Sequence, residues 1–101
     1  MISANIGKDV RRKVYRRDDF QCALCGDVRH LQIHHIIPRS IGGSDFPENL
    51  VTLCAQCHAI AHGVTFPYLP DYMNREWAEQ AIVEYVSDYY AERGEEWYPW
   101  K

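Results

Sequence analysis

The sequence lacks any apolar run near the roughly 20 residues that a membrane-spanning helix needs. Residues 1–8 also lack the apolar stretch of a secretory signal peptide, and the chain contains neither repeats nor low-complexity segments. These absences argue against a membrane or secreted protein, so we expect a cytoplasmic one. At 101 residues, the chain has the length of one domain, 1–101.

Cysteine is scarce, but its four occurrences form two pairs, Cys22-x-x-Cys25 and Cys54-x-x-Cys57. Each pair offers two thiolates at the spacing that one tetrahedral zinc ion requires. In a reducing compartment, paired cysteines favour a metal over disulfides, and a short domain often needs such a staple. The pattern predicts a structural Zn²⁺ site with four thiolates and no open position. Two disulfides or a redox role are the alternatives.

The net charge of -3 is unexpected for a nucleic-acid-binding protein, but it hides a split between the two halves. Residues 1–43 carry eight Lys and Arg against four Asp and Glu, whereas residues 44–101 carry three against ten. Such asymmetry indicates a charged partner, because local clusters set the field that a polyanion meets. For the acidic half, an ordinary solvated helix surface is the simpler interpretation.

Apolar periodicity and turn signals predict a small α+β fold. We expect a basic helix at 9–17 and a strand at 31–37, which Pro38 ends. A second strand is expected at 50–53, followed by a helix at 55–62, which Gly63 stops. After a loop, a long helix with an aromatic-rich apolar stripe is expected at about 73–93, with Gly94 as its C-cap. The aromatic tail 97–100 either packs on the core, frays or contacts another chain.

Four of the five histidines form a pattern that suits a metal site. His34 and His35 are adjacent in a predicted strand, so they point to opposite faces. His58 and His62 are spaced i, i+4, which places both on one face of a helix. One strand histidine facing that helix would complete a three-histidine site, and the other would be free to act as a base. Surface histidines, or His58 as a spare zinc ligand, are the alternatives.

Three stretches of the chain, taken in order, form a recognisable motif. They are Arg17-Asp18-x-Phe20-x-Cys22-x-x-Cys25-Gly26, Leu31-x-Ile33-His34-His35-Ile36-Ile37-Pro38-Arg39-Ser40-x-Gly42-Gly43-Ser44-Asp45, and Asn49-Leu50-x-x-Leu53-Cys54-x-x-Cys57-His58-x-x-x-His62. Together they resemble the HNH endonuclease family over about 14–62, roughly half of the chain. The resemblance implies a ββα-metal core with a structural Zn(Cys)4 site, here flanked by an N-terminal basic helix and a long C-terminal helix.

The resemblance also implies roles for individual residues. His35 would be the general base that activates a water, and Asn49 would hold the loop between the strands and so keep His35 oriented. His58, the last H of the family name, would be a metal ligand, as would His34 and His62. A water would replace His62 if that side chain is not bound.

The implied chemistry is hydrolysis of DNA phosphodiester bonds with one catalytic divalent cation as a Lewis acid. Imidazole ligands suit Zn²⁺, Ni²⁺ or Mn²⁺ better than Mg²⁺, although phosphate oxygens would add ligands that suit Mg²⁺. We expect double-stranded DNA, bound with weak sequence preference. Arg39 is a candidate phosphate contact, with a solvated loop arginine as an equal alternative. Further phosphate contacts are expected from the basic helix, through Arg11, Arg12, Lys13 and Arg16.

Three points stay open at this level. Arg17 followed by Asp18 is either part of the basic surface or a structural ion pair. A non-catalytic zinc-stapled module that binds nucleic acid is the main functional alternative, although a degenerate copy would be expected to lose His35 or Asn49. A protein partner, or a homodimer formed through the acidic C-terminal helix, is compatible with the sequence.

Overall fold

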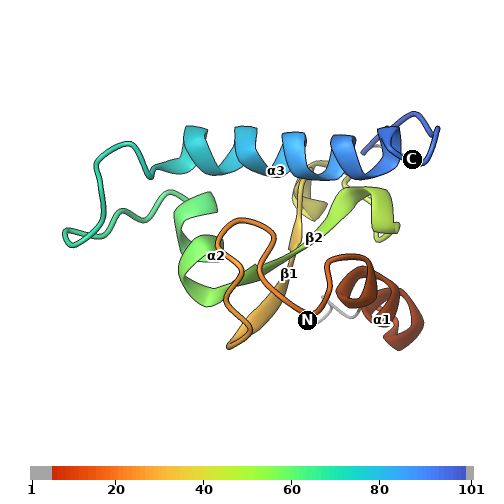
Figure 1. The fold of residues 1–101 in the computed structure, drawn as a ribbon, viewed down its shortest axis with the longest axis horizontal. Coiled ribbons are helices and arrows are strands. Elements are labelled where there is room, and N and C mark those ends of the chain that lie inside the picture. Colours follow the sequence, from red (N-terminus) through yellow and green to blue (C-terminus); the bar gives the residue numbers. More distant parts are fainter. Residues whose placement is uncertain (1–5, 100–101) are drawn as a thin grey trace.

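The computed structural model describes residues 6–99, which form a small α+β fold with a two-stranded sheet (Figure 1). The elements run in the order α1 (Lys8–Arg17), β1 (Leu31–His35), β2 (Leu50–Cys54), α2 (Ala55–Ala61) and α3 (Arg75–Ala91). Two short 3-10 turns, Arg39–Ile41 and Pro47–Asn49, lie in the loop between the strands. Among residues 6–99, no helix has both the length and the apolar character needed to cross a bilayer.

β2 is the centre of the core, because all five of its residues are buried. Val51 and Leu53 belong to the larger apolar cluster, which α2 and α3 complete with Ile60, Ile82 and Val86. Leu50 belongs to a smaller cluster, which α1 completes with Val14. Figure 1 accordingly shows the hairpin between α3, along the top, and α1, at lower right. A short apolar run bounded by turn signals is typical of a strand buried in this way.

The two strands are antiparallel, with Leu31 opposite Cys54 and His35 opposite Leu50. The prediction that the first strand continues to Ile37 is wrong for its last two residues. The amide of Ile36 still donates to the Asn49 carbonyl, but the amide of Asn49 donates to Phe46 within the 3-10 turn, so the reciprocal bond is absent and the ladder ends at His35. The next amide, that of Ile37, donates to the side chain of Asn49, at 2.7 Å.

The long C-terminal helix was predicted at about 73–93, but α3 runs from Arg75 to Ala91, so it is about two residues shorter at each end. Asn74 caps its start, since the side-chain oxygen accepts from the amide of Trp77 at 3.0 Å. Past its end, the amides of Gly94 and Glu95 donate to Ala91 and Tyr90, and Gly94 has φ +74. In the tail, the indole of Trp97 donates to the Glu48 carbonyl, while Trp100 lies outside the described residues.

Arg17 and Asp18 form a buried ion pair, which settles the alternative left open by the sequence. Asp18 is 1% exposed; it accepts from the Arg17 Nε at 2.8 Å and from the Thr52 amide at 2.9 Å. Arg17 also donates to the carbonyls of Pro47 and Leu50. The pair therefore joins the end of α1 to β2, and Arg17 serves packing rather than an open basic surface.

The loop between the strands approaches its own backbone closely at Gly43. A Cβ atom at this position would lie 1.8 Å from the carbonyl oxygen of Ile37 and 2.9 Å from that of Pro38. Both neighbours are backbone atoms, so a side chain could be accommodated only by moving the loop. The preceding Gly42 has φ +98, which ends the 3-10 turn in a conformation that favours glycine.

We therefore expect Gly43→Ala to reduce the free energy of unfolding by about 2 kcal/mol, since the loop must shift to relieve the overlap. Urea denaturation measures this change. Gly7→Ala is the matched control, because no atom lies within 4 Å of a Cβ built there. Equal stability losses in the two variants would contradict the steric argument.

Candidate active site and cysteine cluster

The four cysteines gather where β1 begins and β2 ends, and their sulfur atoms lie within 4.8 Å of one another. Cys22 and Cys25 come from the turn before β1, Cys54 ends β2, and Cys57 lies in the first turn of α2. All four are free thiols, and three are buried, with Cys25 exposed. The arrangement suits a tetrahedral ion with four thiolate ligands and indicates a zinc site.

Close packing makes the ionisation of these thiols interdependent. A hydrogen bond from Cys57 lowers the pKa of Cys22 to about 4. The same contact, followed by burial, raises the pKa of Cys57, and burial raises the pKa of Cys25 to about 11. Four thiolates packed this closely repel one another, and a bound cation would offset that repulsion.

Three histidines form a second cluster between the sheet and α2. His34 from β1 faces α2, which contributes His58 and, at its C-terminal end, His62. One ring nitrogen from each lies within 4.8 Å of the other two. The Nε2 atoms of His58 and His62 are 3.1 Å apart, close to the separation of two imidazoles on one tetrahedral ion, about 3.3 Å for bonds of about 2.05 Å.

The surroundings disfavour protonation of two of these histidines, His34 and His58. Burial, and then the nearby His58 and His62, lower the pKa of His34 to about 3. Burial and His62 also lower the pKa of His58. A neutral imidazole retains a lone pair, whereas a protonated one has only donors. His34 and His58 are therefore favoured as electron-pair donors for a metal ion.

His35 makes a different contact, although it follows His34 directly. Its Nε2 lies 2.8 Å from Oδ1 of Asp45, in the loop between the strands. Asp45 also pairs with Arg39, and Arg39 first and His35 second lower the pKa of the Asp45 carboxyl. An ionised carboxylate only accepts, so Nε2 of His35 donates in this contact, and a neutral ring in this tautomer has its lone pair on Nδ1.

Asn49 holds the loop between the strands through both polar atoms of its side chain. Its amide nitrogen donates to the carbonyls of Ile37, at 3.1 Å, and Ser44, at 2.9 Å, and its oxygen accepts from the Ile37 amide. The residue is fully buried, so an unsatisfied replacement would carry a desolvation cost. These bonds fix both the segment that follows His35 and the segment that leads to Asp45.

One cavity, of about 490 Å³, joins these groups. Both strand histidines line it, as do both α2 histidines and Arg39. Arg75 and Glu79 from the first turns of α3 close another wall and form an ion pair at 3.2 Å. A cluster of lone-pair donors, a histidine with a free Nδ1 and two arginines thus share one opening in the surface.

Residues 22–63 match the model of the HNH endonuclease family. The chain belongs to the HNH endonuclease family. We call residues 22–63 the HNH core. It contains both clusters and Asn49, whereas α1 and α3 lie outside it.

Three curated relatives illustrate this similarity. Probable mobile endonuclease E of Enterobacteria phage T4 is 54% identical over 39 residues, which cover 39% of this chain and 28% of that protein. The type IV methyl-directed restriction enzyme EcoKMcrA of Escherichia coli (strain K12) is 48% identical over 33 residues, covering 33% and 12%. Anaredoxin of Nostoc sp. (strain PCC 7120 / SAG 25.82 / UTEX 2576) is 36% identical over 56 residues, covering 54% and 74%. The chain thus spans a small part of the first two and most of the third.

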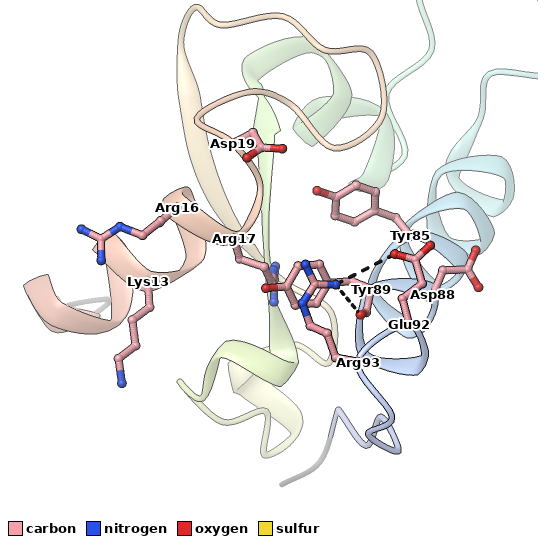
Figure 2. Close-up of a pocket in the computed structure, with 9 residues that line it drawn as sticks. All are labelled: Lys13, Arg16, Arg17, Asp19, Tyr85, Asp88, Tyr89, Glu92 and Arg93. Atoms are coloured by element: carbon pink, nitrogen blue, oxygen red, sulfur yellow. Dashed lines mark hydrogen bonds and ion pairs between the residues drawn. The ribbon is translucent and has the colours of Figure 1, made fainter.

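The predicted nucleic-acid contacts of the basic helix lie away from the histidine cavity of the HNH core. Arg11 and Arg12 line a shallow pocket on the surface of α1. Lys13 and Arg16 line a separate pocket of about 590 Å³ between α1 and α3. Figure 2 shows both side chains extending away from α3, while Arg93 lies across Tyr89, 3.5 Å from the ring centroid. Of the predicted contacts, only Arg39 lines the histidine cavity.

Sequence reasoning missed four residues of this site. Asp45 was part of the matching motif but had no assigned role, and Gln32, whose side chain contacts His58, was not considered. Gln32 was detectable, because it precedes His34 by two positions and so shares its face of the strand. No sequence pattern pointed to Arg75 or Glu79, since their place at the histidine cavity depends on how α3 packs.

Proposed function

We propose that this protein is a metal-dependent endonuclease that hydrolyses DNA phosphodiester bonds. The observation that carries the proposal is the shared cavity. It combines three clustered imidazoles able to hold one cation with a fourth histidine whose Nδ1 is free to accept a proton. The phage relative is named a probable mobile endonuclease and the Escherichia coli relative a restriction enzyme, and both names agree with this activity.

His35 is the proposed general base. Its Nδ1 accepts a proton from a water molecule as the water oxygen attacks phosphorus, the bond from phosphorus to the 3′ oxygen breaks, and the leaving 3′ oxygen takes a proton from solvent water. Asp45 stabilises the positive charge that His35 gains, through the existing contact at Nε2. Asn49 keeps this histidine in place by fixing the backbone on both sides of the loop. The products are 5′-phosphate and 3′-hydroxyl ends.

His34, His58 and His62 are the proposed ligands of the catalytic divalent cation. Their donor type fits Zn²⁺, Ni²⁺ or Mn²⁺, and substrate oxygens would add ligands that suit Mg²⁺. When bound, the cation supplies Lewis-acid stabilisation of charge on the phosphate and the leaving 3′ oxygen. His34 and His58 keep their lone pairs available for it because burial lowers the pKa of each.

Binding of the DNA backbone is the proposed role of the arginines and lysines. Arg39 lies at the cavity, where a phosphate would compete with Asp45 for its guanidinium. Arg11, Arg12, Lys13 and Arg16 would contact phosphates farther along a duplex, because α1 is separate from the cavity. Such contacts position the duplex without reading its sequence, which agrees with weak sequence preference.

Cleavage of supercoiled plasmid tests the proposal. Protein that holds one zinc ion per chain should nick the plasmid only after Mg²⁺, Mn²⁺, Ni²⁺ or further Zn²⁺ is added, because the cysteine cluster has no open ligand position. The measurement is the loss of supercoiled plasmid on a gel, with the protein's zinc content measured beside it. No cleavage with any of these metals, on single- or double-stranded DNA, would favour a zinc-stapled binding module.

A further inference from the structure

One polar contact at the histidine cavity has no role in the mechanism above. The side-chain oxygen of Gln32, on β1, lies within hydrogen-bonding distance of Nδ1 of His58, on α2. An amide oxygen can only accept, so Nδ1 of His58 carries the proton in this contact. The lone pair is then left on Nε2, the atom that lies 3.1 Å from Nε2 of His62.

The hairpin and the helix together create this contact. Gln32 and His34 are two positions apart on β1 and therefore share one face of the strand. α2 follows β2 without an intervening loop, and β2 pairs with β1. The helix consequently returns across the face that carries Gln32 and His34, and His58, in its first turns, meets both side chains.

We infer that Gln32 is a positioning residue that selects the tautomer and ring orientation of His58. The inference rests on the metal site of the proposed function, because its purpose is to present Nε2 of His58 to the cation. Partners of this kind around metal-binding histidines typically change metal affinity by about 10- to 100-fold. Gln32 is exposed, so we expect its replacement to change folding stability little.

The tautomer of His58 is a direct readout that needs neither metal at this site nor activity. In full-length protein with zinc at the cysteine cluster, long-range ¹H–¹⁵N spectra at pH 8 distinguish a protonated from an unprotonated ring nitrogen. We expect a protonated Nδ1 at His58 and a mixture of tautomers in Gln32→Met. A protonated Nε2 in the wild type would overturn the inference, since Gln32 would then be donating through its amide nitrogen.

Affinity for Co²⁺ at the histidine cluster is the second readout, measured by calorimetry. We expect Gln32→Met to weaken binding by about 10- to 100-fold, and Gln32→Glu to restore it, because a carboxylate keeps the acceptor. Gln80→Met is the matched control, because Gln80 lies on α3 beside Glu84 and not at the cavity. Unchanged affinity in Gln32→Met, or no rescue by Gln32→Glu, would overturn the inference.

These outcomes separate the inference from the nuclease proposal. If the wild type binds Co²⁺ and shows the expected Gln32 effects but cleaves no DNA, the nuclease proposal fails and Gln32 retains its role at the metal. If the wild type cleaves DNA while Gln32→Met keeps the wild-type tautomer and affinity, only the inference fails. A wild type that binds no Co²⁺ at the histidines would overturn both.

Discussion

His35→Ala is expected to lower kcat for plasmid nicking by about 100- to 10,000-fold, the range typical for loss of a general base. Metal binding at the histidine cluster should stay unchanged, because His35 contacts Asp45 and is not one of the three clustered side chains. The measurements are the rate of nicking at saturating metal and the Co²⁺ affinity by calorimetry. A large loss of rate with unchanged affinity would separate the base from the ligands.

His30→Asn is the matched control for this experiment. His30 is exposed and lies outside the residues that line the cavity. Its φ of 54 is one that asparagine tolerates. We expect wild-type nicking from this variant. If His35→Ala cleaved as fast as His30→Asn with the metal bound, His35 could not be the base.

Removal of zinc from the cysteine cluster is expected to abolish cooperative folding. Zinc binding to structural four-ligand sites is worth about 10–16 kcal/mol in small peptides at pH 7, which matches or exceeds the whole stability of a typical domain, about 5–15 kcal/mol. The cluster also ties the turn before β1 to the start of α2, and its member Cys57 is fully buried. Circular dichroism during thermal unfolding, before and after treatment with a strong chelator, measures the effect.

The control is a reducing agent used without a chelator. A phosphine reductant breaks disulfides but leaves thiolate ligands in place, so it should not change the melting temperature. Cys57→Ser should behave like the chelated protein, because a hydroxyl does not replace a thiolate ligand. Unfolding by the reductant alone would instead support the disulfide alternative, and a zinc-free protein that melts cooperatively would contradict the staple.

Much of the fold was predictable, because the signals were local. The apolar run of β2 and the amphipathic pattern of α3 each specify an element through burial of one surface. Their ends were less predictable. β1 stops at His35 because the amide of Asn49 donates to the Phe46 carbonyl in a 3-10 turn instead of to Ile36. No pattern within the strand itself contains that competitor.

The double glycine, Gly42-Gly43, is a second feature whose physical reason could not be predicted from the sequence. The family resemblance drew attention to Gly42 and Gly43, but it gave no physical reason for Gly43. The structure supplies one, since the backbone carbonyl of Ile37 occupies the space of a Cβ atom. The reason lies in a contact between two parts of a folded loop, which has no counterpart in the order of residues.

The sequence by itself determined which groups the protein has for chemistry: four thiols in two pairs, two helical histidines one turn apart, and two adjacent strand histidines. These follow from spacing, because helices and strands repeat at fixed periods. Tertiary structure decided which strand histidine faces α2, gave His35 the Asp45 partner, and brought Gln32 to His58. It also moved the basic helix away from the cavity and placed Arg75 beside it. Alternation along a strand defines two faces, but only the packing of β2, α2 and α3 determines which face is covered.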